Sequence, residues 1–147
     1  KIAEYDAFLT KQDPAFTVEE LEEAMQKVMD QYAGGIGTHY QFNEKQLAMA
    51  EEKIKKLQIL AKGLAAADMH ELMFIYELKE RLTVCLTVIA HLRARKETRW
   101  HSFAENLDYP EKSDAWLCYV NSKKNGDQIT MIRRDLVKGG ETYEHRD

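Results

Sequence analysis

The chain has 147 residues and a formal net charge of −4, and it contains only 7 Gly and 2 Pro. Its 44% hydrophobic content supplies enough apolar material for a core, which excludes intrinsic disorder and low-complexity or collagen-like chains. The length suits one domain. The mildly acidic balance argues against a nucleic-acid or anionic-membrane surface, and no apolar run approaches the about 20 residues of a membrane span.

The cysteines and histidines predict neither a disulfide framework nor a metal site. Cys85 and Cys118 are too far apart in sequence for a zinc motif, and two cysteines cannot build a disulfide scaffold. The five histidines form no metal-binding motif. We therefore expect a reduced, cytoplasmic protein. The chain begins at Lys1 instead of Met, which we interpret either as processing or as the edge of a longer chain.

The first half of the chain predicts two amphipathic helices after a lead-in over residues 1–16. The first is expected at 17–33, because Thr17 and Glu20 have capping-box spacing and apolar residues follow at intervals of three and four. Gly34 and Gly35 end it; since they follow a helix, they do not indicate a phosphate-binding loop. The second helix is expected at 43–63 with Asn43 as its N-cap. Its apolar stripe is the most regular in the chain: Leu47, Ala50, Ile54, Leu57, Ala61 and Leu64.

The third helix is expected at 68–98, beginning at Asp68. Its apolar residues cover most of the circumference, so this helix requires neighbours on several sides. Two runs rich in β-forming residues follow, at 116–120 and 128–132, and Asn125-Gly126 supplies a turn between them. The residues from Lys138 onward are expected to fray.

Together these elements predict a mainly α fold. An elongated three-helix bundle of the spectrin-repeat type occupies residues 17–98, and a C-terminal extension over 99–147 carries a small β-hairpin near 116–133.

The end of the third helix has the most unusual local composition, with a cluster of basic residues followed by Arg99, Trp100 and His101. Cations near a helix C-terminus favourably meet the helix dipole, which accounts for the basic cluster. A guanidinium, an indole and an imidazole in succession suit a contact with another surface. We predict that Arg99, Trp100 and His101 form an interdomain or subunit contact; a solvated helix end and a direct substrate contact are the alternatives. No catalytic, cofactor-binding or metal-ligating residue is assigned.

Four short sequences, in order, carry a resemblance to a known family. They are Ala-Gly-Gly-Ile at 33–36, Asp-Met-His-Glu-Leu at 68–72, Glu-Thr-Arg-Trp at 97–100, and Trp-Leu-Cys-Tyr-Val-Asn-Ser-Lys at 116–123. With them, the chain resembles the C-terminal helical domain of flavoproteins of the fumarate reductase/succinate dehydrogenase superfamily, most closely the adenylylsulfate reductase alpha-subunit family. Relatives that act on dicarboxylates resemble this region with Glu-Ser-Arg-Gly, where this chain has Thr98 and Trp100. The chain departs from the alpha-subunit family at His101-Ser102, where Pro-Gly is usual.

The resemblance implies that the chain is a fragment of a larger enzyme. In that family FAD is bound by a separate N-terminal domain of the same chain, and iron–sulfur clusters are carried by a partner beta subunit. The complete enzyme reduces adenylylsulfate to sulfite and AMP. The fragment itself would hold no cofactor and would be inactive, serving as a scaffold for the flavin domain and the beta subunit, with no nucleic-acid partner. The alternatives are a fumarate reductase or succinate dehydrogenase-like domain, and a free-standing helical interaction module.

Overall fold

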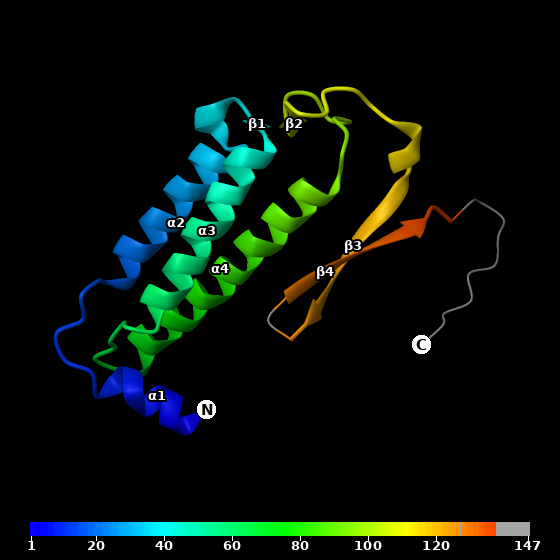
Figure 1. Cartoon of the computed structure of the whole chain (residues 1–147). Coiled ribbons are helices and arrows are strands. Elements are labelled where there is room, and N and C mark those ends of the chain that lie inside the picture. Colours follow the sequence, from blue (N-terminus) through cyan, green and yellow to red (C-terminus); the bar gives the residue numbers. More distant parts are fainter. Residues whose placement is uncertain (127, 138–147) are drawn as a thin grey trace.

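The computed structural model describes residues 1–126 and 128–137 and is dominated by three long helices lying side by side (Figure 1). These are α2 (Val18–Tyr32), α3 (Glu44–Ala61) and α4 (Met69–Ala94). They run in alternating directions, and α3 packs against both α2 and α4. The predicted mainly α class, a three-helix bundle followed by a β-hairpin, is confirmed.

Side-chain caps fix the start of each bundle helix where the sequence predicts it. Thr17 Oγ1 accepts a hydrogen bond from the Glu20 amide at 3.2 Å, and the Glu20 carboxylate accepts one from the Thr17 amide at 2.9 Å. Asn43 makes the same reciprocal pair at the start of α3. At the start of α4, Asp68 Oδ1 accepts from two amides of the first turn. These bonds satisfy amides that would otherwise lack an intrahelical partner.

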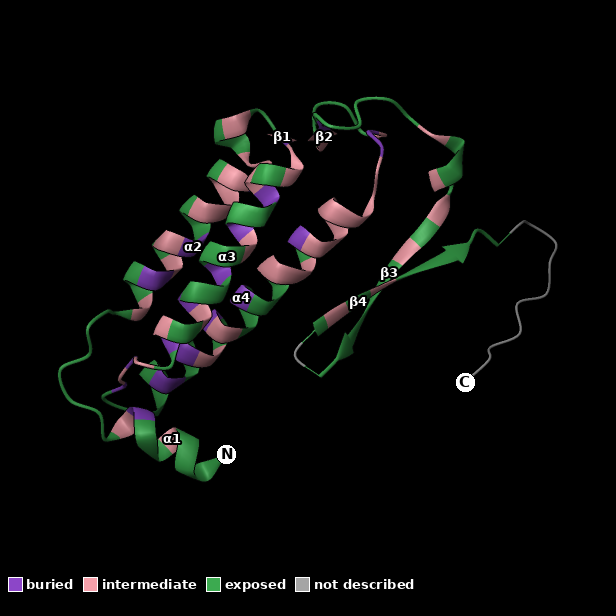
Figure 2. Ribbon diagram, viewed as in Figure 1, coloured by how far each residue is buried: buried purple, intermediate pink, exposed green. Residues whose placement is uncertain are grey.

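The core lies where the stripes of the three helices meet (Figure 2). Every residue of the stripe predicted for the second helix is buried. The long α4 buries one side only: Leu72, Ile75, Leu78, Leu82 and Ile89 face the core, whereas Met73, Phe74, Val84 and Val88 remain exposed. The expectation that this helix has apolar residues beyond those its own bundle covers therefore agrees with the structure.

The lead-in contains a helix that the sequence does not predict. This helix, α1 (Ile2–Leu9), lies beneath the bundle and buries Phe8 in the core (Figure 1). The carbonyl of Phe8 accepts a hydrogen bond from the Ala66 amide at 3.0 Å, which ties α1 to the connection between α3 and α4. A helix of two turns carries too few residues for a periodic pattern, so its position depends on this long-range packing.

The third helix ends at Ala94, four residues before the predicted end at 98, which corrects that boundary. Arg95 has φ −84° and ψ 111°, so the helical conformation stops at this residue. The reason is that the side chains following Ala94 bind partners in a distant loop, as described below. Propensity alone favours continuing the helix, and these tertiary contacts override it.

The hairpin pairs β3 (Cys118–Asn125) with β4 (Gln128–Asp135) in antiparallel register and lies beside α4 (Figure 1). Both strands are longer than the predicted runs. Asn125 pairs with Gln128, so it remains in the strand, and the left-handed position of the turn falls on Gly126, with φ +60°. The predicted fraying from Lys138 onward lies outside the described residues.

A short parallel pairing joins the two connections at one end of the bundle. Residues of β1 (Gln41–Phe42) pair with those of β2 (Glu105–Asn106), which lie 64 residues later. The Glu105 amide donates to the carbonyl of Tyr40, the residue before β1, at 2.9 Å, and the Leu107 amide donates to the Phe42 carbonyl at 2.8 Å. This pairing places the loop after α4 directly beside the turn between α2 and α3.

Candidate functional site at the end of the bundle

The loop after α4 is organised around the buried carboxylate of Glu97, whose side chain is 0% exposed. The Arg99 guanidinium donates to both of its oxygens at 2.9 Å, and Arg95 donates to one at 2.5 Å. The backbone amide of Ser113 donates to Glu97 at 2.9 Å. A carboxylate removed from water needs such charged and polar partners, and here they come from both ends of the loop.

The electrostatics of Glu97 follow from these contacts. Burial alone would raise the pKa of this carboxyl group, but the hydrogen bonds from Arg99, the Ser113 amide and Arg95 outweigh burial and lower the pKa to about 2. The same pairing raises the pKa of Arg99. Glu97 is therefore ionised at neutral pH and acts as the negative centre of the loop.

This lowered pKa predicts a loss of stability in acid. The pKa of Glu97 is about 2 in the folded chain against an ordinary value of 4.5, so its contribution is fully present above about pH 4.5 and is lost as the pH falls toward 2. We expect urea unfolding midpoints to fall across this window. The Glu97→Gln variant, which has no group to titrate, should show a flatter profile there. Parallel profiles for the two proteins would contradict the assignment.

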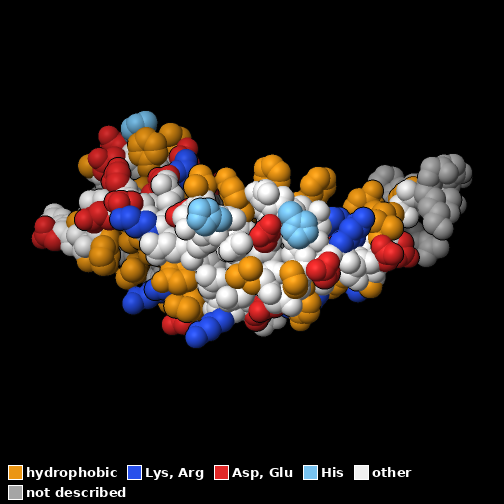
Figure 3. Space-filling view, turned by 90° about the horizontal axis from the view of Figure 1, so that it is seen from above, with side chains coloured by type: hydrophobic (Ala, Val, Ile, Leu, Met, Phe, Trp, Pro, Cys, Tyr) orange, Lys and Arg blue, Asp and Glu red, His pale blue; other side chains and the backbone are white. Residues whose placement is uncertain are grey.

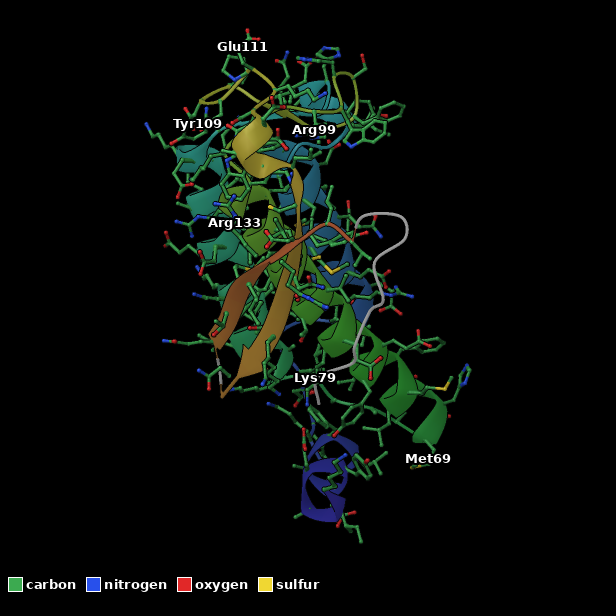
Figure 4. All side chains as sticks on the ribbon, turned by 90° about the vertical axis from the view of Figure 1, so that its right-hand side faces the viewer. Met69, Lys79, Arg99, Tyr109, Glu111 and Arg133 are labelled. Carbon is green, nitrogen blue, oxygen red and sulfur yellow. The ribbon has the colours of Figure 1, made fainter. Side chains whose placement is uncertain are left out.

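Thr98 and Asn106 hold the middle of the same loop. Both are buried, and the Thr98 hydroxyl accepts from the Asn106 amide at 2.9 Å and donates to the Tyr109 carbonyl at 3.0 Å. The Thr98 amide donates to the Glu111 carbonyl at 3.2 Å. Figure 4 shows Tyr109, Glu111 and Arg99 gathered at this end of the molecule. The loop is therefore fixed by internal hydrogen bonds, although it is mostly irregular backbone.

The three predicted contact residues have different environments. Arg99 is largely covered, with 20% of its side chain exposed, and it binds both Glu97 and the Ser113 carbonyl. Trp100 and His101 are exposed, and the His101 ring lies 3.4 Å from a carboxylate oxygen of Glu105. Arg99 therefore shapes the loop from inside, and Trp100 and His101 lie on its surface.

A set of exposed apolar side chains, which we call the end patch, lies on the two turns that the β1–β2 pairing brings together. It consists of Ile36, Tyr40, Trp100 and Phe103. Trp100 is 70% exposed and Phe103 74%, and the Tyr40 and Phe103 rings lie 6.4 Å apart. Figure 3 views this end of the molecule and shows hydrophobic side chains there among histidine and charged ones. Large apolar side chains grouped in this way are typical of a surface that another protein or domain covers.

The backbone of the end patch is also unusual. His39, Tyr40 and Ser102 have φ values of 54°, 62° and 71°, in the left-handed region that residues with a Cβ rarely adopt. They lie in the two turns that present the end patch. Residues held in this region cost free energy and cluster at functional surfaces, which agrees with a binding role for this end.

The structure also bears on metals and membranes. Among the described residues, no group of His, Cys, Asp and Glu side chains is arranged to hold a metal ion. Within residues 1–126 and 128–137, no helix has both the length and the apolar character to cross a membrane.

The turn at 34–37 uses its polar groups internally, since the Gly37 amide donates to Asp30 Oδ1 at 2.9 Å.

The sequence contains one signal for the buried centre. Arg95, Glu97 and Arg99 alternate in charge at every second position. In an extended segment such residues point to the same side, so they can form an ion-pair triad, whereas in a helix they diverge. The expected helix through 98 concealed this pattern. Tyr40 and Phe103 belong to no motif, and the motif at 33–36 gives Ile36 no surface role; the β1–β2 pairing brings their turns together.

Comparisons with known proteins agree with this architecture. The adenylylsulfate reductase subunit alpha of Megalodesulfovibrio gigas is 34% identical over 98 residues, which are 66% of this chain and 15% of that protein. The structure of adenylylsulfate reductase from Archaeoglobus fulgidus has a TM-score of 0.84 and 32% identity, covering 97% of this chain and 24% of the other. An adenosine-5-phosphosulfate reductase in complex with sulfite has a TM-score of 0.83 and 34% identity with the same coverage.

A more distant structure, that of the E. coli quinol fumarate reductase, has a TM-score of 0.77 at 18% identity, covers 97% of this chain and 25% of the other, and shows the fold alone. The chain spans a quarter or less of the length of all these relatives. The family described as fumarate reductase flavoprotein C-term matches residues 22–141. Because this match covers most of the chain, the protein belongs to the family of fumarate reductase flavoprotein C-terminal domains.

Proposed function

We propose that the chain is the C-terminal helical domain of the alpha subunit of an adenylylsulfate reductase, which converts adenylylsulfate to sulfite and AMP. The observation that carries the proposal is the identity of 32–34% with three adenylylsulfate reductase chains, against 18% with the fumarate reductase. In the proposed enzyme this domain is a scaffold. It supports the FAD-binding domain of the same chain and contacts an iron–sulfur beta subunit.

In this proposal FAD is bound outside these 147 residues. The glycine-containing turn at 34–37 does not fit a phosphate of the cofactor. A Cβ on Gly35 would lie 2.3 Å from Asp30 Cα, and Asp30 Oδ2 lies 2.5 Å from the position of a Cβ on Gly37. The turn is therefore packed against a carboxylate, which would repel a phosphate. FAD would accept electrons and pass them to the substrate in its own domain.

The end patch is the surface by which this domain would contact the FAD-binding domain. Glu97, Thr98 and Arg99 fix the loop, and Trp100 and Phe103 project from it with most of their surface exposed. Aromatic side chains on a rigid loop lose little conformational entropy on binding and often dominate interface energies. The exposed side of α4 offers further apolar surface. The free thiols of Cys85 and Cys118 suit a reducing location, the cytoplasm.

The test of the proposal is an assay of the full-length subunit together with its beta subunit. Reduced methyl viologen serves as electron donor, and adenylylsulfate and fumarate are offered separately. We expect stoichiometric sulfite and AMP from adenylylsulfate and no succinate from fumarate. Succinate formation without sulfite would assign the chain to a dicarboxylate enzyme. Activity of neither kind, with no flavin in the purified subunit, would favour a free-standing interaction module.

The same preparation tests the contact surface. Trp100→Ser together with Phe103→Ser should lower the temperature at which FAD is released, because the end patch no longer buries apolar area against the FAD-binding domain. The exposed Ile2→Ser in α1, which lies at the opposite end of the molecule, is the matched control. FAD release detected by flavin fluorescence at the same temperature in all three proteins would place the contact elsewhere.

A further inference from the structure

A groove of about 940 Å³ lies between the turn of the hairpin and the helices α1, α3 and α4. Six lysines line it, from several elements: Lys11, Lys55, Lys62, Lys79, Lys123 and Lys124. Figure 4 shows Lys79 close to the turn end of the hairpin, on the side of the bundle that the strands cover. Among the described residues of the lining, Glu4 is the one carboxylate.

Most of this positive charge is not neutralised within the part of the chain that the structure describes. Lys55 pairs with Glu51 and Lys79 with Glu4, each at 2.5 Å. The four other lysines of the groove have no ion-pair partner among the described residues. The chain as a whole carries a charge of −4, so the groove opposes the overall charge of the protein. A concave surface with one sign of charge concentrates ligands of the opposite sign.

The groove also has an apolar floor. Ile59 on α3 is 65% exposed, and Phe8, Leu86 and Ile129 are the other large apolar residues of the lining. The hydroxyls of Thr83 and Thr87 donate to carbonyls of their own helix at 3.0 Å, so they offer no free donor to a ligand. An isolated phosphate would require hydrogen-bond donors that converge on one point, and the apolar floor would add nothing to its affinity. Dispersed ammonium groups over apolar side chains fit a ligand with several carboxylates and apolar groups along its length.

The shape favours an extended ligand. A second cavity of about 530 Å³ shares Lys55, Leu86, Gln128 and Ile129 with the groove and follows the hairpin toward the end of α4. Its lining adds two carboxylates, Glu44 and Glu51, and both are paired with cations of the same cavity: Lys55, Arg93 and Lys96. The two cavities therefore form one channel, which is lined by the hairpin on one side and by helices on the other. An extended polypeptide could lie in this channel, with alternate side chains pointing to the lysines and to the floor.

We propose that this channel binds an extended acidic segment of a partner polypeptide, in which carboxylates alternate with apolar side chains. The inference rests on the lysines, the apolar floor and the channel and is independent of the proposed enzyme. Lysines 62, 123 and 124 contribute the charge that selects the acidic segment, and Ile59 contributes the apolar contact.

The experiment measures binding of a fluorescein-labelled dodecapeptide of alternating Glu and Leu by fluorescence anisotropy. Lys62→Gln, Lys123→Gln and Lys124→Gln are combined in one variant of the chain. The matched control combines Lys27→Gln, Lys45→Gln and Lys112→Gln, which removes the same charge from exposed positions outside the channel. We expect the groove variant to bind about tenfold more weakly or worse, and the control within about twofold of the original chain. Circular dichroism checks that both variants keep their thermal midpoint.

Three outcomes would overturn the proposal. The first is no peptide binding at low salt at protein concentrations up to about 1 mM, a concentration that would detect even a weak single contact. The second is an equal loss of peptide affinity in the two lysine variants. The third is tighter binding of single-stranded oligothymidylate than of the peptide, which would assign the channel to nucleic acid. Ile59→Gln supplies a second readout. It should weaken peptide binding while leaving the salt dependence unchanged, because it removes the apolar contact and no charge. An unchanged affinity in this variant would contradict the role of the floor.

Discussion

Replacing Glu97 by Ala should lower the free energy of unfolding by about 3 kcal/mol, because it leaves two arginines and a backbone amide without their shared partner. Arg95 and Arg99 are partly solvated, so they recover some hydration. The expected loss in free energy of unfolding is therefore at the lower end of the range for a buried charge that loses its partner. The measurement is urea unfolding at pH 7, followed by far-ultraviolet circular dichroism.

The exposed pair between Glu23 and Lys27 supplies the matched control, since Glu23→Ala also removes a carboxylate from an ion pair. Exposed pairs contribute little, so its unfolding curve should superimpose on that of the original chain. Tryptophan fluorescence gives a second signal, which reports on the loop through Trp116. The Trp116 ring lies 4.3 Å from the Arg133 guanidinium, and its carbonyl accepts a hydrogen bond from Arg95. If Glu97→Ala matched the control by both signals, the buried triad would not hold the loop.

The other large effect is expected in the long helix. Leu82→Ala should cost about 3 kcal/mol, within the range of 2–5 kcal/mol typical of a leucine removed from a close-packed core. Leu82 is 0% exposed, whereas Val84, two positions later, is 60% exposed. Val84→Ala therefore provides the control on the opposite side of the same helix and should leave the unfolding midpoint nearly unchanged. Equal losses would mean that the outer side of α4 is also covered in the isolated chain.

These two residues illustrate what could be predicted from the sequence. Caps and regular stripes depend on neighbours within one helix, so the starts at Thr17, Asn43 and Asp68 and the inner side of α3 followed from local spacing. The buried side of α4 could not be predicted from local spacing, because its apolar residues lie on every side of the helix. Packing against α2 and α3 decides that Leu82 is buried and Val84 is exposed.

Only part of the candidate site can be predicted from the sequence, because some of its contacts join residues far apart in the chain. Trp100 and His101 stand out by their composition, and both lie on the surface, where their role in a contact stays a prediction. One partner of Arg99, the Ser113 carbonyl, lies 14 positions later in the chain, and the end patch depends on a strand pairing across 64 positions. Such contacts are decided by the free energy of the whole fold. A pattern read within a window of about 18 residues does not reach across 64 positions, and the contact between Arg99 and Ser113 within such a window follows no helical or strand period.

The anchors of the loop after α4 have a consequence for how its surface can change. Beyond the side chains of Arg95, Glu97, Thr98 and Arg99 themselves, most partners of this loop are main-chain groups: the Ser113 amide and carbonyl and the carbonyls of Tyr109, Trp116 and Cys118. The carbonyl is present in every residue type, and the amide N–H in every type except proline. The loop can therefore exchange outward side chains such as those at 100, 101 and 103 and keep its path, so one scaffold can acquire new binding specificities by substitution alone. Position 102 is the exception, because its positive φ favours glycine.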